Sequence, residues 1–374
     1  MKINIANPQR EIIKFKNFKN QLFSEVLSGR YVGGEQVEQF EENLKNFFQV
    51  KYATTLNSGT DALLLSLITL GIKENDEVIV PSFTYFATVE TILQLKAKPI
   101  FVDVEKDSYV TSAKKIESLL TKKTKCIIPV HLFGYDCDIK NIKKLGQKYN
   151  IPIIEDTAQA FGSKSSSGKF LGTQGKINAF SNYPSKTLGG IGDGGFVLTN
   201  NKELNKSIRL LKNHGQKKQY EHIIPGFNSR LDSINAFVLL KKLEIFDEIY
   251  NLIKNFEEFY VKFFQNFDNI YFPSFNENIL LNNFTIILPR QHRNNILKDL
   301  NQKGIEARIY YPIPIHKQKA LSEKKVLYKN IDLSNSEKLS KSILSLPFYS
   351  FPTKKELAYL KTELTKSFKK FKIQ

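Results

Sequence analysis

The sequence predicts an α/β protein with a large, mainly parallel sheet domain and a smaller C-terminal α+β domain. Apolar runs typical of buried strands alternate with helical patterns up to about residue 245, which favours a parallel sheet with helices on both faces. The pattern changes after that point. The chain of 374 residues is also long enough for roughly two domains. We therefore expect a large domain over residues 1–248 and a small domain over residues 249–374.

The first part of the chain carries clear signals for helices and strands. Apolar and aromatic side chains at helical spacing predict a helix over residues 37–48. A second helix is expected to open at Thr60, because Ser58 and Gly59 supply a cap-like start, and to continue to Leu70. Short apolar runs predict strands at residues 77–80, 99–102, 126–130, 152–155 and 196–199.

The remaining part of the chain is more helical. A long, charged, helix-like stretch covers residues 231–256. After it, the pattern predicts a strand over residues 283–288, a helix over 294–303, a strand over 307–311 and a helix over 354–368. This mixture is typical of a small α+β domain, and no repeat or low-complexity linker marks where it begins.

The composition limits the class of protein. The net charge is +18, but the lysines are scattered rather than gathered in a stripe or a recognisable module, so we expect no nucleic-acid partner. No apolar run reaches the ~18 residues of a membrane helix, and the polar start lacks a signal-peptide core, so we expect a cytoplasmic protein without a membrane anchor. Cys126 and Cys137 stand in no metal-like spacing and make no disulfide framework, so no metal site is expected.

Asp156 and Lys186 are the candidate catalytic residues. Asp156 follows the apolar run of residues 151–154, and Lys186 lies among small residues and glycines that let a bulky cofactor approach the backbone. Taken singly, such an Asp is usually a cap or turn former and such a Lys a solvated charge. Together they supply what pyridoxal phosphate (PLP) requires: an amine for the Schiff base and an acid that keeps the pyridine nitrogen protonated.

A glycine run near Lys186 formally matches a dinucleotide-binding fingerprint. The match consists of Gly190, Gly192 and Gly195. The fingerprint has to follow a strand and open a helix, whereas these glycines lead into the predicted strand over residues 196–199. We therefore reject a dinucleotide site at this place.

Several motifs, in one order, carry a resemblance to a known family. They read NSGTDALLLSL from residue 57, PSFTYFATVETI from 81, FVDV from 101, EDTAQAFG from 155, SNYPSKTLGGIGDGG from 181 and GFNSRLD from 226. From about residue 28 to 347 the chain resembles the DegT/DnrJ/EryC1/StrS family of sugar aminotransferases. The resemblance implies the aspartate-aminotransferase type of fold (PLP fold type I) and PLP as the cofactor.

The resemblance also implies which residues bind the phosphate of PLP. Gly59, Thr60 and Asp61 lie at a helix start, where unpaired N–H groups and the dipole favour an anion, although the same residues fit an ordinary N-cap equally well. Ser181 matches the family serine that contacts the phosphate. Asn228 matches the asparagine that reaches the phosphate of the neighbouring subunit, which implies a homodimer with shared active sites.

Other matches concern the ring and the sugar. Tyr85 stands where the family has an aromatic ring over the pyridine, although an aromatic residue at such a junction is more often core packing. Gln159 matches the residue that contacts the cofactor face near its phenolic oxygen. The matches on the sugar side are Tyr183, Tyr310, Tyr311 and His316.

The activity implied is transfer of an amino group from L-glutamate to a keto-sugar nucleotide, with Lys186 as general acid and base. The motifs NSRLD and YYPIPIH are more similar to the 3-keto group of the family, so we expect amination at C-3 of a dTDP-3-keto-6-deoxyhexose. Phe161, Asn182 and Tyr310 depart from the usual residues. By analogy, the pathway would make a sugar for lipopolysaccharide or another surface glycan.

Alternative functions stay open at this point. One is C-4 amination of a UDP-, dTDP- or GDP-linked 4-keto sugar. Another is a PLP-dependent sugar dehydratase, but those relatives have His at the lysine position, so Lys186 argues against it. The third is a non-enzymatic regulatory or nucleic-acid-binding protein, suggested by the basic charge. Such a role would not need the set formed by Asp156, Ser181, Lys186 and Asn228.

Overall fold

The computed structural model of the protein describes residues 1–322 and 331–373, and its centre is a twisted α/β sheet. Strands in the order β1-β7-β6-β5 and β3-β2-β4 form two sheets that are joined by parallel bridges from Ile127 to Ile153 and from Val130 to Asp156. Strand β7 runs antiparallel to β1 and β6, and the other described pairings within this sheet are parallel. The predicted mainly parallel sheet is therefore confirmed. The strands are β1 (Tyr52–Leu56), β2 (Glu77–Pro81), β3 (Lys98–Val102), β4 (Thr124–Ile127), β5 (Ile154–Asp156), β6 (Ile177–Ser181) and β7 (Gly195–Thr199).

Helices cover both faces of this sheet. Along β7, the side chains of Phe196 and Leu198 belong to the same buried apolar cluster as Phe40, whereas Val197 belongs to a second cluster with Leu65. Successive side chains of a strand point to opposite faces, so the helices that carry Phe40 and Leu65 lie on opposite sides. The helices and small strands of this part are α3 (Glu35–Phe48), α4 (Gly59–Thr69), α5 (Ala87–Gln94), α6 (Ala113–Glu117), η1 (Leu132–Gly134), α7 (Ile139–Tyr149), α8 (Lys202–Leu211), β8 (Gln216–Lys218) and β9 (Glu221–His222).

The carboxyl ends of the parallel strands meet at one edge of the sheet. There β5 ends at Asp156, β6 ends at Ser181, and β1 leads through Ser58 into α4. Because β7 runs the other way, it begins at this edge, and Gly195 pairs with Ser181. Open α/β sheets bind their ligands at this edge, so the order of the strands brings the candidate residues together.

The predicted helical stretch over residues 231–256 is two helices rather than one. These are α9 (Ser233–Glu244) and α10 (Phe246–Phe264), and they meet at Ile245, whose φ of −108° and ψ of 18° interrupt the helical geometry. The apolar pattern continues across this break because both helices bury one face. Periodicity alone therefore gave no sign of the change in direction.

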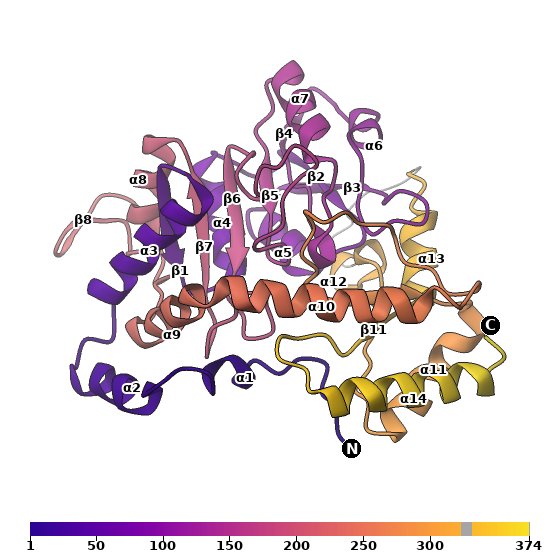
Figure 1. The fold of residues 1–374 in the computed structure, drawn as a ribbon. Helices are drawn as coiled ribbons and strands as arrows, with labels where there is room; N and C mark the ends of the chain where they lie inside the picture. The colour runs from indigo at the N-terminus through magenta and orange to yellow at the C-terminus, as the bar shows by residue number, and fades with distance from the viewer. Residues whose placement is uncertain (323–330, 374) are drawn as a thin grey trace.

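Helix α10 connects the sheet with the C-terminal part of the chain. Figure 1 shows it as the long orange helix that runs along the molecule. Near its start, Phe246 packs against Phe161, and at its end Phe264 stacks on Phe284. Among the described residues, no helix combines the length and the apolar character that crossing a bilayer requires.

The C-terminal part combines a two-stranded antiparallel sheet with helices. The expected strand over residues 307–311 does not form; Arg308 instead makes one isolated bridge to Ser345, since Pro312 and Pro314 follow directly and have no N–H to donate. The elements here are β10 (Phe284–Ile287), α11 (Arg290–Gln302), η2 (Ile315–Lys317), α12 (Lys319–Ser322), α13 (Ser334–Ser342), β11 (Ile343–Leu346) and α14 (Lys354–Lys370).

The first residues of the chain lie against this C-terminal part. The N–H of Ile3 donates to the carbonyl of Gly304 at 2.8 Å, and the carbonyl of Ile3 accepts from Glu306 at 2.8 Å. Helices α1 (Gln9–Ile12) and α2 (Phe18–Leu27) then lead toward the sheet. The division near residue 248 stays a prediction, and these contacts favour counting the first residues with the small domain.

Candidate active site

A cavity of about 580 Å³ lies at the carboxyl edge of the sheet. This volume is in the ordinary range for a small-molecule site. Its walls come from the start of α4, the ends of β5 and β6, and the segment before Pro312 in the C-terminal part. Among the residues singled out from the sequence, those that line the cavity are Gly59, Thr60, Tyr85, Asp156, Gln159, Ser181, Tyr183, Lys186, Tyr310 and Tyr311.

Asp156 lies at the inner end of this cavity. Its side chain is buried, the hydroxyl of Thr88 donates to Oδ2 at 2.9 Å, and the N–H of Ala158 donates to Oδ1 at 3.2 Å. Burial raises the pKa of Asp156, whereas the two hydrogen bonds and the charge of Lys186 lower it, and the result stays above the ordinary value. The carboxyl group is therefore fixed in position and ready to pair with a cationic N–H.

Lys186 follows β6 in a tight loop at the same end. Its backbone N–H donates to the carbonyl of Tyr183 at 2.8 Å, and the next N–H, of Thr187, donates to Oδ1 of Asn282 at 3.1 Å. Burial lowers the pKa of Lys186 to about 8, against the opposing effect of Asp156. An amine with such a pKa is partly neutral near neutral pH, so it can act as a nucleophile and as a base.

The start of α4 forms another wall. Ser58 is its N-cap and accepts the N–H of Asp61 at 3.0 Å, while the first N–H groups of a helix have no partner within the helix. A Cβ atom added to Gly59 would lie 2.7 Å from Cβ of Ser181, so only glycine allows this close approach. Thr60 also lines the cavity here. The result is a small pocket of N–H and hydroxyl donors that suits a phosphate.

Aromatic side chains also line the cavity. The rings of Tyr85 and Tyr311 lie 5.8 Å apart, and Nε2 of Gln159 is 3.1 Å from the hydroxyl of Tyr311. The carbonyl oxygen of the same Gln159 side chain accepts the N–H of Phe133 at 2.8 Å. Tyr85 is 59% exposed, which excludes the core-packing alternative for this residue. Its ring is free to cover a flat ligand.

These features together fit PLP. Asp156 would face the ring nitrogen, Lys186 would hold the carbonyl carbon, and the phosphate would lie against Gly59, Thr60 and Ser181. The cavity thus combines a buried acid, an amine of lowered pKa and a helix start, which are the three features that PLP requires.

Three predicted site residues lie elsewhere. His316 does not line the cavity; its buried ring lies 2.5 Å from Oγ of Ser82 and 3.1 Å from Oε1 of Glu337, and its contact with the sugar stays a prediction. Asp61 is also absent from the lining, and its N–H donates to the N-cap Ser58; its contact with the phosphate stays a prediction. Asn228 is exposed and outside the cavity of its own chain, so its contact with a partner subunit stays a prediction.

The structure also reveals contributors that the sequence did not indicate. Thr88 holds Asp156, and Asn282 fixes the backbone beside Lys186. Arg308 lines the cavity as well. Thr88 had a signal, since it shares a motif with Tyr85 and lies one helical turn after it. Asn282 and Arg308 had none, because each reaches the site from a segment far away in the sequence.

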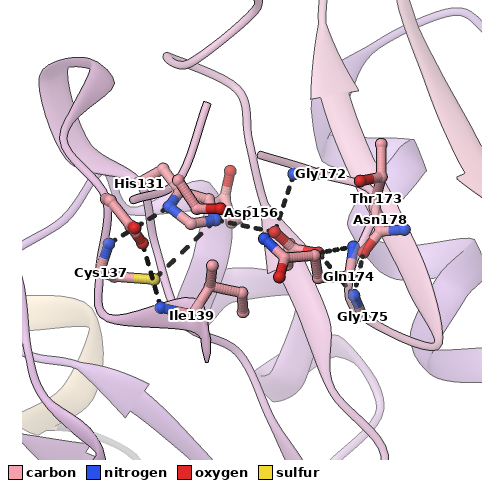
Figure 2. Close-up of polar contacts among 12 residues, drawn as sticks. His131, Cys137, Ile139, Asp156, Gly172, Thr173, Gln174, Gly175 and Asn178 are labelled. Carbon is pink, nitrogen blue, oxygen red and sulfur yellow. Dashed lines mark hydrogen bonds and ion pairs between the residues drawn. The ribbon is translucent and has the colours of Figure 1, made fainter. Parts of the chain in front are cut away.

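A fully buried ion pair supports the end of β5. Nε2 of His131 lies 3.0 Å from Oε2 of Glu155, which also accepts the N–H of Gly172 at 2.8 Å; the other oxygen accepts Gln174 and Gly175 (Figure 2). Burial opposes the charge on His131, but Cys137 and Glu155 outweigh it and raise the pKa of His131 well above its ordinary value. The pair locks the strand that presents Asp156.

His131 also belongs to a group with metal-like spacing. Ligand atoms of His131, Asp136 and Cys137 lie within 4.8 Å of one another. However, Nε2 of His131 already has a carboxylate partner, since it lies 3.0 Å from Oε2 of Glu155. Burial also raises the pKa of Cys137, which keeps the thiol protonated. We assign the group to packing beside the site.

Comparison with known proteins gives one consistent family. The sequence model of the DegT/DnrJ/EryC1/StrS aminotransferase family matches residues 14–365. The UDP-2-acetamido-2-deoxy-3-oxo-D-glucuronate aminotransferase of Pseudomonas aeruginosa is 37% identical over 324 residues, which are 86% of this chain and 88% of that protein. The GDP-perosamine synthase of Escherichia coli O157:H7 is 36% identical over 314 residues, 82% of this chain and 85% of that protein.

A solved structure agrees with this assignment. The crystal structure of NtdA from Bacillus subtilis with bound cofactor PMP has a TM-score of 0.87 and 29% identity, and it covers 98% of this chain and 85% of that one. PMP is the aminated form of PLP. The likeness supports the predicted type of fold over nearly the whole length.

Proposed function

The chain belongs to the DegT/DnrJ/EryC1/StrS aminotransferase family, and on that premise we propose that it moves an amino group from L-glutamate to C-3 of a keto-sugar nucleotide. The family makes it a nucleotide-sugar aminotransferase. The proposal adds the amino donor, the position on the sugar and the residues that carry the reaction.

One observation carries the residue assignments. Asp156 and Lys186 line the same cavity, with an aromatic side chain, Tyr85, and the start of α4 on its walls. The acid is buried and hydrogen-bonded, and burial lowers the pKa of the amine to about 8. PLP, when bound, supplies an aldehyde that takes up the amino group and a ring that withdraws electrons.

The residues of the chain would then divide the work. Lys186 accepts and returns a proton at Nζ beside the reacting carbon, and its lowered pKa makes both directions accessible near neutral pH. Asp156 keeps the opposite ring nitrogen protonated by pairing with its N–H. Thr88 and the N–H of Ala158 orient that carboxylate, and Tyr85 excludes water from one ring face.

The sugar position is argued from the motifs and one relative. NSRLD and YYPIPIH favour a 3-keto acceptor, with a dTDP-3-keto-6-deoxyhexose as the first candidate. The Pseudomonas relative is named for a 3-oxo sugar linked to UDP, which supports C-3 and brings UDP into the choice of nucleotide. The Escherichia relative is named for a GDP-linked sugar, so C-4 amination of a UDP-, dTDP- or GDP-linked 4-keto sugar stays the alternative.

A substrate panel tests the proposal. Purified protein is incubated with L-glutamate and 3-keto or 4-keto nucleotide sugars, and aminated products are detected by mass spectrometry. We expect amination of the 3-keto substrates. Activity on 4-keto substrates alone would overturn the choice of C-3. A colourless protein that gains no absorbance with added PLP would overturn the enzyme assignment and favour the regulatory alternative.

We also propose a homodimer in which Asn228 completes the partner's site. This residue is exposed and lies outside its own cavity, as such a role requires. Mixing inactive Lys186→Ala and Asn228→Ala proteins should then restore activity, because one site of the mixed dimer keeps both residues. Mixing Lys186→Ala with Asp156→Asn is the control and should restore none, since both residues belong to the same subunit's site.

A further inference from the structure

The mouth of the cavity carries a cation that the cofactor does not use. The charged side chains that line the described cavity belong to Asp156, Lys186, Asp193 and Arg308. Asp156 and Lys186 are assigned to the cofactor. Arg308 is therefore the permanent positive charge left for another ligand, and its side chain is 54% exposed.

The side chain of Arg308 is held in place by Glu306. Its Nε donates to Oε1 of Glu306 at 2.8 Å, and Oε2 of Glu306 accepts the N–H of Ile5 at 2.9 Å. The bonds to Glu306 use one edge of the guanidinium, which has five N–H donors in all. The remaining donors can meet a second anion.

Two phenols stand beside this guanidinium. Burial raises the pKa of the Tyr310 phenol against the effect of the nearby Arg308 guanidinium, and both side chains line the cavity together with Tyr183. Tyr183 is 53% exposed. Two hydroxyl groups and a guanidinium on one rim are donors that suit a carboxylate.

The rim lies directly beyond the cofactor end. Gln159 bonds to Tyr311, the preceding residue is Tyr310, and Tyr310 lies beside Arg308. This series of contacts runs from the ring position to the rim along a single wall. A group bound at Arg308 therefore belongs to the part of the substrate that follows the reacting carbon.

We propose that Arg308, with Tyr310 and Tyr183, binds a carboxylate of the substrate. The inference rests on the proposed aminotransfer and names a chemical feature of the ligand. Two sources share this chemistry: the distal carboxylate of the amino donor and a carboxylate on the acceptor sugar. A guanidinium binds either through paired N–H···O bonds, which a lysine ammonium cannot reproduce.

Binding of unreactive probes tests the inference without turnover. The purified holoprotein is titrated by calorimetry with glutarate against butyrate, and with UDP-glucuronate against UDP-glucose. Each pair differs by one carboxylate. Wild type is compared with Arg308→Gln, with Arg308→Lys, and with Arg290→Gln as control, because Arg290 is exposed at the start of α11 and does not line the cavity.

We expect Arg308→Gln to weaken the acid of at least one pair by about 10- to 100-fold, the usual effect of losing a charge-assisted hydrogen bond. Its neutral partner should change by less than about twofold, Arg308→Lys should recover part of the loss, and Arg290→Gln should change nothing. An effect on glutarate assigns the site to the donor. An effect on UDP-glucuronate assigns it to the sugar and moves the acceptor from a 6-deoxyhexose to a uronate.

Other results would overturn the inference. Equal weakening of UDP-glucose and UDP-glucuronate would mean that Arg308 binds the diphosphate. Unchanged affinities in Arg308→Gln, or no binding of any probe to wild type, would also contradict the carboxylate site. Absorbance of the bound cofactor and its response to L-glutamate are measured on the same samples. If the wild-type protein shows neither the absorbance of a bound cofactor nor a response to L-glutamate, the proposed function itself is contradicted.

Discussion

The inner end and the mouth of the cavity differ in how their side chains are held. Asp156, at the inner end, is 5% exposed and is fixed by Thr88 and a backbone N–H. Tyr183 and Arg308, at the mouth, are each more than half exposed. The side chains at the inner end are thus fixed for one chemistry. Those at the mouth can be substituted to suit another substrate with little loss of stability.

The support behind the two regions differs in the same way. The end of β5 rests on the buried His131–Glu155 pair, whose carboxylate accepts the N–H groups of Gly172, Gln174 and Gly175 (Figure 2). Arg308 rests on Glu306, an ion pair in which the arginine side chain is exposed. Buried pairs are strongly destabilising to break, whereas exposed pairs contribute about 0–1 kcal/mol. Substitutions should therefore lower the stability strongly at the inner end and only slightly at the mouth.

The largest effect is expected for Lys186→Ala. It removes the amine that holds the cofactor and moves the proton, so turnover should fall by about 10⁴-fold or more, the upper range for loss of a general base. The visible absorbance of the bound cofactor should disappear with it. Lys144→Ala, an exposed site on α7, is the control and should retain both. Full turnover in Lys186→Ala would show that the inner end of the cavity does not carry the chemistry.

The next effect is on stability. Glu155→Gln breaks a fully buried ion pair, which should lower the free energy of unfolding by about 3–5 kcal/mol. Glu203→Gln, from an exposed pair with Lys206, should change it by less than about 0.5 kcal/mol. Urea unfolding followed by circular dichroism measures both. Similar losses in the two variants would mean that the inner end has no special support.

The same pair predicts a pH dependence. A histidine whose pKa is raised by folding contributes stability that is complete below its unfolded pKa of 6.5 and is lost as the pH rises through the higher folded value. The wild-type protein should therefore lose part of its stability on the alkaline side. In Glu155→Gln this loss should be smaller, and an unchanged pH profile would contradict the assignment of the pair.

Local sequence signals were enough to indicate the inner end. A strand leading to Asp156, a capped helix start at Gly59 and a lysine among glycines can each be read within a few residues. Strand β1 was not predicted, because its sequence, Tyr-Ala-Thr-Thr-Leu, contains no continuous apolar run. Its Thr55 is buried only because the N–H and hydroxyl both bond to Glu41, at 2.8 and 2.9 Å.

Other parts of the site could not be predicted in this way. Arg308 and Asn282 reach the cavity through the packing of the C-terminal part against the sheet, which no short pattern encodes. His316 shows how packing acts on a motif. It lies in the YYPIPIH motif, yet the chain turns after Tyr311 and buries the imidazole between Ser82 and Glu337. A motif names the segment, but packing decides which of its side chains faces the cavity.

A further prediction concerns the phosphate pocket. In Gly59→Ala the new Cβ would lie 2.7 Å from Cβ of Ser181, so the helix start has to move. Such overpacking costs about 1–3 kcal/mol, and PLP affinity should fall by roughly 10-fold or more. Gly192→Ala is the matched control, because a Cβ there meets nothing within 4 Å. Equal PLP affinity in both variants, measured by absorbance titration, would place the phosphate elsewhere.

Another prediction follows from the lowered pKa of Lys186. Only the neutral amine attacks an aldehyde, so the rate at which apoprotein captures PLP should rise with pH and level off above about 8. Below that value the rate should fall about tenfold per pH unit. Stopped-flow absorbance gives the profile. A rate that keeps rising to pH 10 would show a lysine with an ordinary pKa, and the inner end would then lose its distinction from the exposed mouth.

The smallest effect is expected at the mouth itself. Tyr183→Phe removes one hydroxyl from a side chain that is 53% exposed, so water can replace it when the substrate is absent. A single neutral hydrogen bond is worth about 0.5–1.5 kcal/mol, which predicts a rise in KM for the sugar of roughly 2- to 10-fold with kcat nearly unchanged. Tyr149→Phe on α7, whose hydroxyl bonds to Glu117 away from the cavity, is the control. A fall in kcat of about 100-fold in Tyr183→Phe would mean that this phenol acts on the reacting atoms, because a hydroxyl used only for binding changes KM first. The residues that take part in the chemistry would then include an exposed side chain at the mouth, and burial alone would not separate catalytic residues from substrate-binding residues.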